Sequence, residues 1–226
     1  TLKNISKNKK SLKKISIKFD DLPFWFKDKT TSWSTTDKKR FLKNFNKEPS
    51  LHIVFKDPDK LKSFEENLIS TSEVSGFLIK RKNINEIKSF KKGEWWVQDF
   101  SSFFPLQSLQ IKDKNKKFLD ACAAPGGKSF QAICSKSKVT LNDKNVKRVR
   151  ILKQNLKRLK FNFDVLNYDA LKLNLQDKFD IVILDSPCSS IGTIRRNPEI
   201  FFKSREPEIK KLNLIQKALL EKSKSL

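Results

Sequence analysis

The chain has 226 residues and is strongly basic, with 49 Lys and Arg against 25 Asp and Glu, a formal net charge of +24 and a pI near 10.0. Charge of this sign attracts polyanions, and between nucleic acid and an anionic membrane surface we expect nucleic acid. No apolar run of about 18 residues and no signal-peptide core occurs, which argues against a membrane-spanning or secreted protein. We therefore expect a cytoplasmic monomer.

The cysteines and the histidine point away from a metal or disulfide protein. Cys122, Cys134 and Cys188 show neither an even count nor a metal-ligand spacing, so we expect reduced thiols and no bound metal. His52 is the only histidine and lies in a strand-like segment. We predict that it is a surface or hydrogen-bonded residue without a catalytic role.

The chain is predicted to contain three parts. It begins with Thr1, contains no Met and stops at Leu226 within a helical pattern, so we expect a fragment of a longer protein. Residues 1–20 are a basic arm or the end of a missing upstream element. Residues 21–108 form a small α+β domain, and residues 109–226 form an α/β domain that is truncated at its C-terminal end.

The small domain is predicted from its aromatic residues and short apolar runs. Aromatic residues from Phe24 to Phe45 predict short helices around an aromatic core, and strands are expected at 51–55 and 77–79. A helix should start at 57–59 and continue with apolar positions to Leu68. Basic residues interleaved with aromatics suit RNA, although a lysine-rich chain shows such clusters by composition alone.

From residue 118 onward, strands alternate with helices, which is the pattern of a parallel sheet with crossover helices. The predicted strands cover 118–120, 139–142, 163–166 and 179–184. A helix follows Gly127, and a longer one covers about 145–160. The run FDIVIL at 179–184 is typical of a central strand covered on both faces.

An acidic residue lies at or just after the end of each predicted strand, namely Asp120, Asp143, Asp169 and Asp185. Ligands of open α/β sheets bind at the carboxyl edge of the strands, so we expect these carboxylates to face one crevice. A carboxylate at the position of Asp143 suits ribose hydroxyls, and Asp169 suits an adenine amino group. Each acid taken alone is more simply a loop residue or a helix cap.

The segment FLDACAAPGGKSF at 118–130 predicts a strand, a tight glycine turn and a helix. Such a turn brings bare backbone close to a ligand, and the helix N-terminus adds unpaired N–H groups and a positive dipole end. The turn lacks the GxGxxG pattern of dinucleotide sites and the first glycine of a P-loop. A nucleotide-like cofactor of another kind is therefore expected here.

Several segments, taken in order, resemble the bacterial rRNA (cytosine-5) methyltransferases of the Sun/RsmB type. They are DACAAPGGK at 120–128, Asp143 with NLKRL at 155–159, YDA at 168–170, DSPCSS at 185–190 and GTIRRNPE at 192–199. Residues 93–102 are similar to the segment that precedes the catalytic domain of that family. The resemblance extends from about residue 22 to the end of the chain.

This resemblance implies a Rossmann-like class I methyltransferase sheet after the small α+β domain. It also implies S-adenosylmethionine as the methyl donor and a cytosine in RNA, expected to be 16S ribosomal RNA, as the acceptor. The methionine end of the cofactor would lie along 122–128, its ribose at Asp143, its adenine near Asp169 and the reacting centre near Asp185. The implied cofactor-binding residues are Cys122, Ala123, Ala124, Pro125, Gly126, Gly127, Lys128, Asp143, Asp169 and Asp185.

The implied catalytic residues are Cys188, Asp185 and Lys128, and the implied RNA-binding residues are Arg195 and Arg196. Carbon 5 of cytosine becomes nucleophilic only after a thiolate adds to carbon 6, so this reaction needs a cysteine. The target base must also leave any stack. The two arginines are either RNA contacts or partners in salt bridges.

The role of Cys188 stays open between nucleophile and product release. In the family the nucleophile is usually a second cysteine, in a Thr-Cys motif on a later strand, and no Thr-Cys pair occurs in this chain. The polypeptide is therefore expected to be inactive if that motif is essential. One alternative is a non-catalytic RNA-binding module that retains the fold. Another is amino-group methylation of adenine, against which Cys188 argues because that chemistry typically uses a Pro-Pro-aromatic turn.

Overall fold

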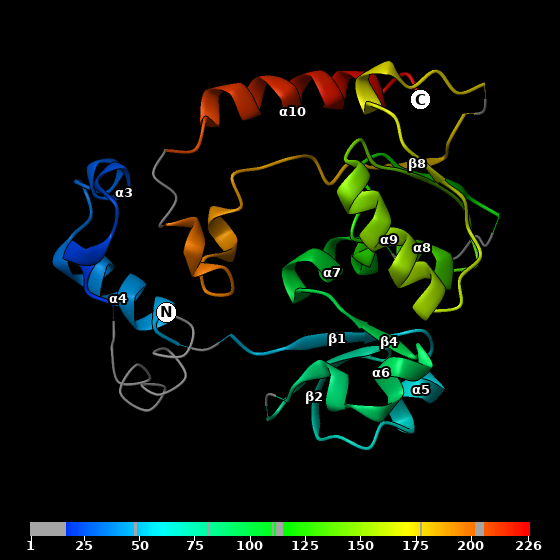
Figure 1. Cartoon of the computed structure of the whole chain (residues 1–226), viewed down its shortest axis with the longest axis horizontal. Helices are drawn as coiled ribbons and strands as arrows, with labels where there is room; N and C mark the ends of the chain where they lie inside the picture. The colour runs from blue at the N-terminus through cyan, green and yellow to red at the C-terminus, as the bar shows by residue number, and fades with distance from the viewer. Residues whose placement is uncertain are drawn as a thin grey trace. The chain divides into compact units, whose positions relative to one another are not determined.

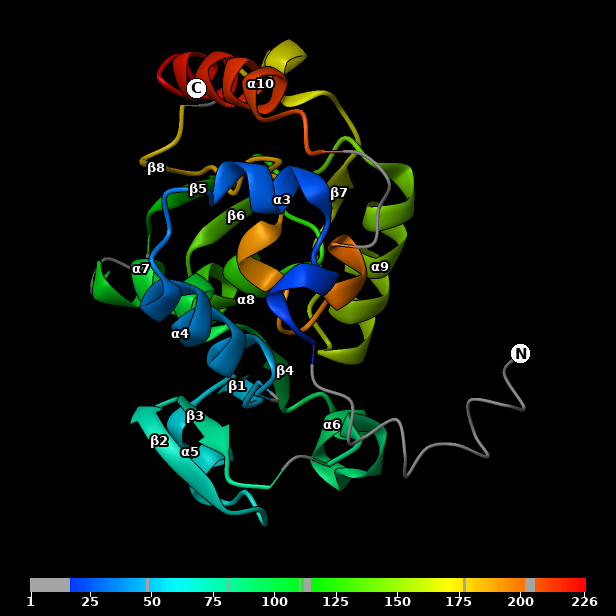
Figure 2. The same cartoon turned by 90° about the vertical axis from the view of Figure 1, so that its left-hand side faces the viewer.

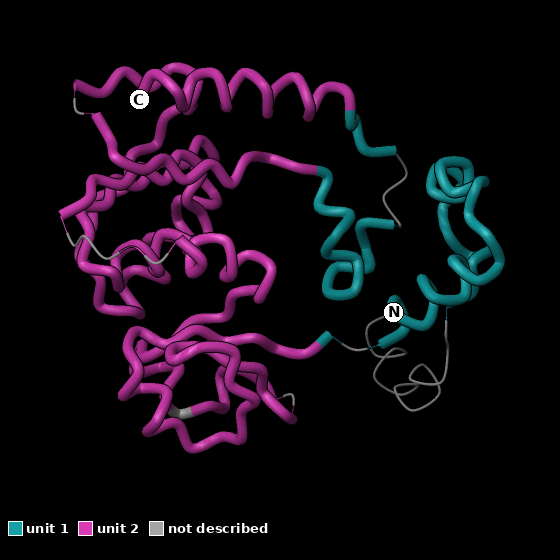
Figure 3. The backbone as a smooth tube through the Cα atoms, turned by 180° about the vertical axis from the view of Figure 1, so that it is seen from behind, with its two compact units in different colours: residues 1–49, 189–209 teal, residues 50–188, 210–226 magenta. Residues whose placement is uncertain are grey.

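The computed structural model describes residues 17–47, 49–80, 82–109, 111, 115–176, 178–201 and 206–226. The chain divides into two compact units, residues 1–49 with 189–209 and residues 50–188 with 210–226 (Figure 3). Most of the predicted basic arm lies outside the described residues, and the domain boundaries at 20 and 108 stay predictions. Within the described ranges, every helix is too short or too polar to cross a bilayer.

The first unit is helical and has an aromatic core. Ser34 caps one helix by accepting a hydrogen bond from the N–H of Asp37, whose carboxylate bonds back to the N–H of Ser34. The predicted short helices are confirmed, and Phe26, Phe45 and Phe201 are buried together. Phe24 is 81% exposed, so its assignment to the core was wrong. The elements are η1 (Phe19–Asp21), α3 (Phe24–Lys29), α4 (Thr35–Phe45), η4 (Ile191–Thr193) and η5 (Pro198–Ile200).

The second unit begins with an antiparallel sheet in the order β2-β3-β1-β4 (Figure 1). Its core contains Ile53, Phe55 and Trp95. This α+β arrangement follows the sequence prediction. The elements are β1 (His52–Phe55), α5 (Pro58–Lys62), β2 (Leu68–Ser72), β3 (Ser75–Leu78), η2 (Ile84–Glu86), α6 (Lys88–Lys92) and β4 (Trp95–Val97).

Helix α5 is shorter than predicted. It starts as expected, with the Asp57 side chain accepting a hydrogen bond from the N–H of Lys60, but it ends at Lys62. Leu68 instead begins β2 and pairs with Leu78 of β3. The helical spacing of the apolar residues was therefore misleading, because pairing with a strand that follows later in the chain outweighs local periodicity.

His52 is fully buried and hydrogen bonded, as the sequence analysis predicted for a residue without a catalytic role. Its Nδ1 lies 2.8 Å from the carbonyl oxygen of Gln98, and its Nε2 lies 2.9 Å from Oγ1 of Thr71. Both ring nitrogens are therefore used inside the small sheet.

The rest of the second unit is a parallel sheet in the order β7-β6-β5-β8 with helices between the strands (Figures 1 and 2). This α/β architecture confirms the predicted fold class. The elements are α7 (Phe100–Ser108), β5 (Lys117–Asp120), α8 (Gly127–Cys134), β6 (Lys138–Asn142), α9 (Val146–Arg158), β7 (Val165–Leu166), η3 (Ala170–Lys172), β8 (Ile181–Ile183) and α10 (Ile209–Ser223).

Helices cover both faces of the parallel sheet. Phe118 of β5 packs against Ala132 of α8, while the next residue, Leu119, packs with Leu219 of α10 on the other face. Helix α9 forms where the sequence predicts a long helix, and its apolar residues Val149, Leu152, Leu156 and Leu159 are buried. Burial of each such aliphatic side chain contributes about 1.5–3 kcal/mol.

The run at 179–184 is not a central strand in the described sheet. Only Ile181–Ile183 forms β8, and its one strand neighbour among the described residues is β5. The predicted cover on both faces is confirmed, because Val182 packs in the cluster that includes α10, while Ile181 and Ile183 pack in the cluster that includes Ala132 of α8.

Candidate functional site at the carboxyl edge of the parallel sheet

The turn between β5 and α8 needs glycine for a steric reason. Gly126 has φ of 119°, and a Cβ at this position would lie 2.0 Å from a ring atom of Phe130. Phe130 is buried and meets Trp96 edge to face, with ring centroids 5.6 Å apart. The Phe130 ring therefore fills the space beneath the turn and fixes its course before α8 begins.

Asp143, directly after β6, holds this turn against the start of α9. Its Oδ2 accepts a hydrogen bond of 3.1 Å from the N–H of Ala124, and its Oδ1 accepts one of 2.8 Å from the N–H of Asn145. Nη1 of Arg148 lies 3.7 Å from Oδ2, and Arg148 also donates to the carbonyl oxygen of Ala124. Arg148 therefore contacts the turn while 44% of its side-chain surface stays exposed.

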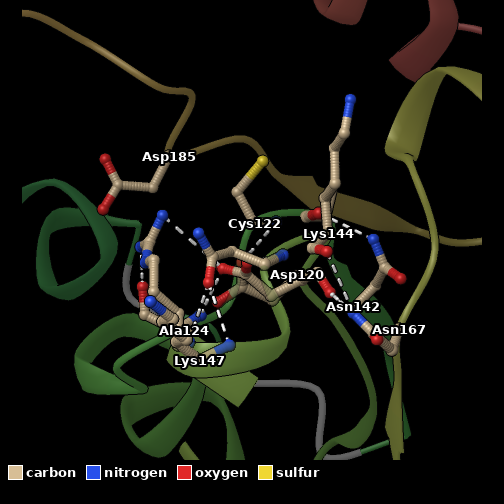
Figure 4. A network of polar contacts seen from close by, with 12 residues as sticks. Asp120, Cys122, Ala124, Asn142, Lys144, Lys147, Asn167 and Asp185 are labelled. Carbon is tan, nitrogen blue, oxygen red and sulfur yellow. Dashed lines mark hydrogen bonds and ion pairs between the residues drawn. The ribbon is translucent and has the colours of Figure 1, made fainter. Parts of the chain in front are cut away.

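Two asparagines tie the strand ends together. The buried Asn142 donates to the carbonyl oxygens of Ala121 (3.0 Å) and Tyr168 (3.1 Å), and its Oδ1 accepts from the N–H of Tyr168 (3.0 Å). Asn167 donates to the carbonyl oxygens of Asp143 and Lys144 (Figure 4). Sequence reasoning missed both residues, and the only signal was their place next to the acidic strand ends.

A cavity of about 710 Å³ lies at this edge of the sheet. It contains two of the predicted acids, Asp143 and Asp169, together with Cys122 and Pro187. Ile215 and Leu219 of α10 and the exposed side chains of Val146 and Leu171 add apolar wall. The space combines apolar walls with carboxylates, which is typical of a small-molecule site.

Asp169 is an ionised carboxylate with a fixed orientation. Its Oδ2 lies 2.6 Å from Nζ of Lys144, and its Oδ1 accepts a hydrogen bond of 3.1 Å from the N–H of Leu171. The hydrogen bond from Lys144 is the main reason that the pKa of Asp169 lies below its ordinary value.

The other two predicted acids line a second, smaller pocket of about 190 Å³. Asp185 follows β8, and its Oδ2 lies 2.7 Å from Nζ of Lys128 on α8. Asp120 is 1% exposed and accepts a hydrogen bond of 2.7 Å from Oγ of Ser129. The four acids thus line two pockets and not the single crevice that we predicted, and both pockets share Cys122 as a wall residue.

Burial perturbs the pKa of Asp120 and of two thiols. It raises the pKa of Asp120 to about 6 and that of Cys122 to about 11, where the carboxylates of Asp120 and Asp143 add to the effect. The pKa of Cys134 rises to about 12, again through burial. Figure 4 shows the Cys122 thiol between Asp185 and Lys144. Cys188 is exposed, one residue after Pro187 of the cavity wall.

The small sheet supports the glycine turn through Gln98. Its Oε1 accepts from Nε1 of Trp96 (2.9 Å), and its Nε2 donates to Oε1 of Gln131 on α8 (2.7 Å). A Cβ on Gly127 would lie 3.2 Å from the Gln98 side chain. Gln98 lies within the segment 93–102 that we had compared with a family motif, but its contacts were not predictable from spacing.

The predicted RNA-binding arginines belong to the other compact unit. Arg195 and Arg196 are both exposed, and Nη2 of Arg195 lies 3.5 Å from the carbonyl oxygen of Lys47. Their contact with RNA stays a prediction. Across the part of the chain that the structure describes, no group of three or more His, Cys, Asp or Glu residues is arranged to hold a metal ion.

A parallel sheet with both faces covered by helices and a ligand cavity at its carboxyl edge is the Rossmann-like architecture of class I methyltransferases. The crystal structure of a methyltransferase homolog protein from Pyrococcus horikoshii shares this fold with a TM-score of 0.68 at 24% identity, over 88% of this chain and 67% of that one. The structure of NSun6 from Pyrococcus horikoshii with SFG matches at 27% identity and a TM-score of 0.55, over 68% of this chain and 41% of that one.

The family model described as 16S rRNA methyltransferase RsmB/F matches residues 106–226, more than half of the chain. The chain belongs to this family, and the predicted resemblance is confirmed. Ribosomal RNA small subunit methyltransferase B of Shewanella oneidensis is 33% identical over 145 residues, which is 62% of this chain and 34% of the relative. The chain thus spans about a third of the length of that curated relative.

Proposed function

We propose that this chain is part of an enzyme that transfers a methyl group from S-adenosylmethionine to carbon 5 of a cytosine in 16S ribosomal RNA. The observation that carries the proposal is the 710 Å³ cavity with Asp143 and Asp169, next to the pocket of Lys128 and Asp185, in a member of the RsmB/F family. The proposed setting is the cytoplasm, with the protein acting as a monomer.

The residues of the cavity fit the proposed cofactor. A volume of 710 Å³ lies within the range of about 300–1,000 Å³ that small-molecule sites occupy. The Asp143 carboxylate accepts two backbone N–H groups, and because a carboxylate offers about four acceptor sites it can still accept from ribose hydroxyls. Asp169 would accept from the adenine amino group beside the apolar side chains of Val146 and Leu171.

The glycine turn would hold the other end of the cofactor. The wall of the smaller pocket includes backbone from Ala123 to Pro125 and Gly127, where the missing side chain leaves room beside Gln98. When bound, S-adenosylmethionine supplies an electrophilic methyl group. We place that reacting end near Asp185, which the ammonium group of Lys128 orients.

We assign the cysteine role in the proposed reaction to Cys188. Cys188 is exposed, whereas the pKa values of the other two thiols are raised by burial, so only Cys188 combines access to RNA with a position near Asp185. Its two proposed roles are addition to carbon 6 of cytosine and assistance in product release.

A non-catalytic RNA-binding role is the second candidate, because the chain carries a net charge of +24. The test is incubation of the full chain with S-adenosylmethionine and a 16S rRNA transcript, followed by mass spectrometry for 5-methylcytidine. Formation of 5-methylcytidine would show that Cys188 suffices as the nucleophile, and the Asp143→Ala variant should then form none. Cofactor binding without any 5-methylcytidine would show that Cys188 does not act as the nucleophile in this chain, whereas a folded chain without cofactor binding would favour the binding module.

A further inference from the structure

Helix α9 carries an unusual concentration of positive charge. Six of its thirteen residues are Lys or Arg and none is acidic, whereas Lys and Arg make up 49 of the 226 residues of the chain. Five exposed cations follow one another along the helix and just past its end. We call them the α9 basic face, and they are Lys147, Arg150, Lys153, Lys157 and Lys160.

The spacing of these residues places them on one side of the helix. Successive members are three or four residues apart, which is the separation of neighbours on a helix surface. The adjoining side of the helix carries Val149, Leu152 and Leu156, all buried in the core. From Arg150 to Lys157 the face extends about 10 Å along the helix axis. In Figures 1 and 2, α9 lies on the outside of the parallel sheet.

The α9 basic face does not stabilise the fold. Like charges three or four residues apart destabilise a helix by a few tenths of a kcal/mol per pair, and a cation in the first turn opposes the helix dipole. The other two cations of α9 do have structural partners, since Arg148 binds the glycine turn and Arg158 donates to the carbonyl oxygens of Phe90 and Trp95. No carboxylate of the described residues lies within ion-pair distance of the five cations of the face.

We propose that the α9 basic face binds the sugar-phosphate backbone of RNA outside the reacting centre. A row of cations without carboxylates complements a polyanion, and such rows track a nucleic acid backbone without reading its sequence. A membrane surface fits less well, because the apolar side of α9 is buried in the core and unavailable to lipid.

The face starts at the rim of the proposed active site. Asn145, Val146 and Lys147 at the beginning of α9 also line the 710 Å³ cavity. An RNA strand bound along α9 would therefore lead toward the cavity. This inference rests on the proposed function, because it names the surface that holds the RNA whose cytosine is methylated.

The test compares two triple variants that each remove one Arg and two Lys. The first is Arg150→Gln, Lys153→Gln and Lys157→Gln. The matched control is Lys39→Gln, Arg40→Gln and Lys43→Gln on α4, where all three side chains are also exposed. Glutamine is a good helix former, so both variants should keep their helices, which circular dichroism verifies.

Binding of a fluorescently labelled oligouridine RNA to the full chain is measured by anisotropy at several salt concentrations. Each single-strand phosphate contact contributes about 0.7 to the slope of log affinity against log salt, so the α9 variant should lower its magnitude by about 2. The control variant should lower the magnitude of the slope by less than about 0.7, the contribution of one phosphate contact. Equal losses in the two variants would overturn the proposal, because net charge alone would then explain binding.

Two further measurements distinguish RNA binding from membrane binding and from a general defect of the variant. Loss of binding to anionic phospholipid vesicles in the α9 variant, with RNA affinity unchanged, would overturn the proposal in favour of a membrane surface. Titration of both variants with S-adenosylmethionine tests the proposed function separately. Unchanged cofactor binding in the α9 variant supports an RNA-specific role, whereas a loss equal to the loss of RNA binding would show a general defect and overturn it.

Discussion

The carboxylate of Asp143 joins the glycine turn after β5 to the start of α9. Its Oδ2 accepts from the N–H of Ala124 in the glycine turn, at 3.1 Å, and its Oδ1 accepts from the N–H of Asn145 at the start of α9, at 2.8 Å. One side chain therefore sets the distance between the turn and the helix. In the proposed enzyme it also faces the ribose, so its structural and binding roles need separate tests.

Substitution Asp143→Asn should lower the free energy of unfolding by about 1–3 kcal/mol. One acceptor oxygen becomes an NH2 group that must face a backbone N–H, and because the side chain is only 4% exposed, the loss of this hydrogen bond is costly. Urea unfolding measures the change.

The matched control is Asp164→Asn, which makes the same chemical change at an exposed position. It should alter the free energy of unfolding by no more than about 0.5 kcal/mol. If the two variants were equally stable, the hydrogen bonds of Asp143 would have no net effect on the fold.

Stability should depend on pH through Asp120. Burial raises its pKa from 3.8 to about 6, so between these values the folded chain holds a proton that the unfolded chain has released. The free energy of unfolding therefore falls as pH rises through this window and stays lower above it. The contribution of this one group is on the order of 3 kcal/mol.

The variant Asp120→Asn isolates this effect because its side chain does not titrate. The free energy of unfolding of the wild type, minus that of the variant, should be larger at pH 4 than at pH 7. Urea titrations at several pH values measure the difference. A difference that stayed constant over this range would show that Asp120 ionises as readily in the folded chain as in the unfolded one.

Substitution Gly126→Ala should destabilise the chain by at least about 2 kcal/mol. The backbone has φ of 119°, and the new Cβ would collide with the buried Phe130 ring. Gly192→Ala is the control, because a Cβ there meets nothing within 4 Å, and it should change stability by about 0.5 kcal/mol or less. Thermal unfolding compares the two, and similar melting temperatures would contradict the packing of the turn.

Thiol reactivity should distinguish the three cysteines. Iodoacetamide at pH 8 should modify Cys188 first, because it is exposed, whereas the pKa values of Cys122 and Cys134 are raised to about 11 and about 12. Peptide mass spectrometry identifies the site, and Cys188→Ser should remove the fast reaction. Fast modification of Cys122 would contradict its burial beside two carboxylates.

Most of the parallel domain could be predicted because its signals are local. The strand, glycine turn and helix at 118–130 follow from short-range residue patterns, as does the buried side of α9. The antiparallel sheet was harder, since Leu68 pairs with Leu78 across a turn and its helical spacing was coincidental. The run 179–184 was expected to be a central strand covered on both faces, but β8 lies at the edge of the described sheet, although both of its faces are covered.

The acids of the site could be predicted from their positions at strand ends, but their partners could not. Arg148 and Ala124 lie 24 residues apart, and nothing in the local pattern joins them. The split into two pockets also depends on packing, because Cys122 projects between the acids of β6 and β7 and those of β5 and β8. Residue types therefore indicate which chemical groups a site contains, whereas contacts between residues distant in sequence decide which of these groups line the same pocket.

The most direct test of the central claim is calorimetric titration of the full chain with S-adenosylmethionine, beside the Asp143→Ala variant. We predict that the wild type binds S-adenosylmethionine saturably and that the Asp143→Ala variant loses most of this binding. The RNA affinity of the variant should be nearly the same as that of the wild type. Circular dichroism shows whether each protein is folded. A folded wild-type chain that binds no S-adenosylmethionine would contradict the assignment of the cavity and leave RNA binding as the better account of this domain.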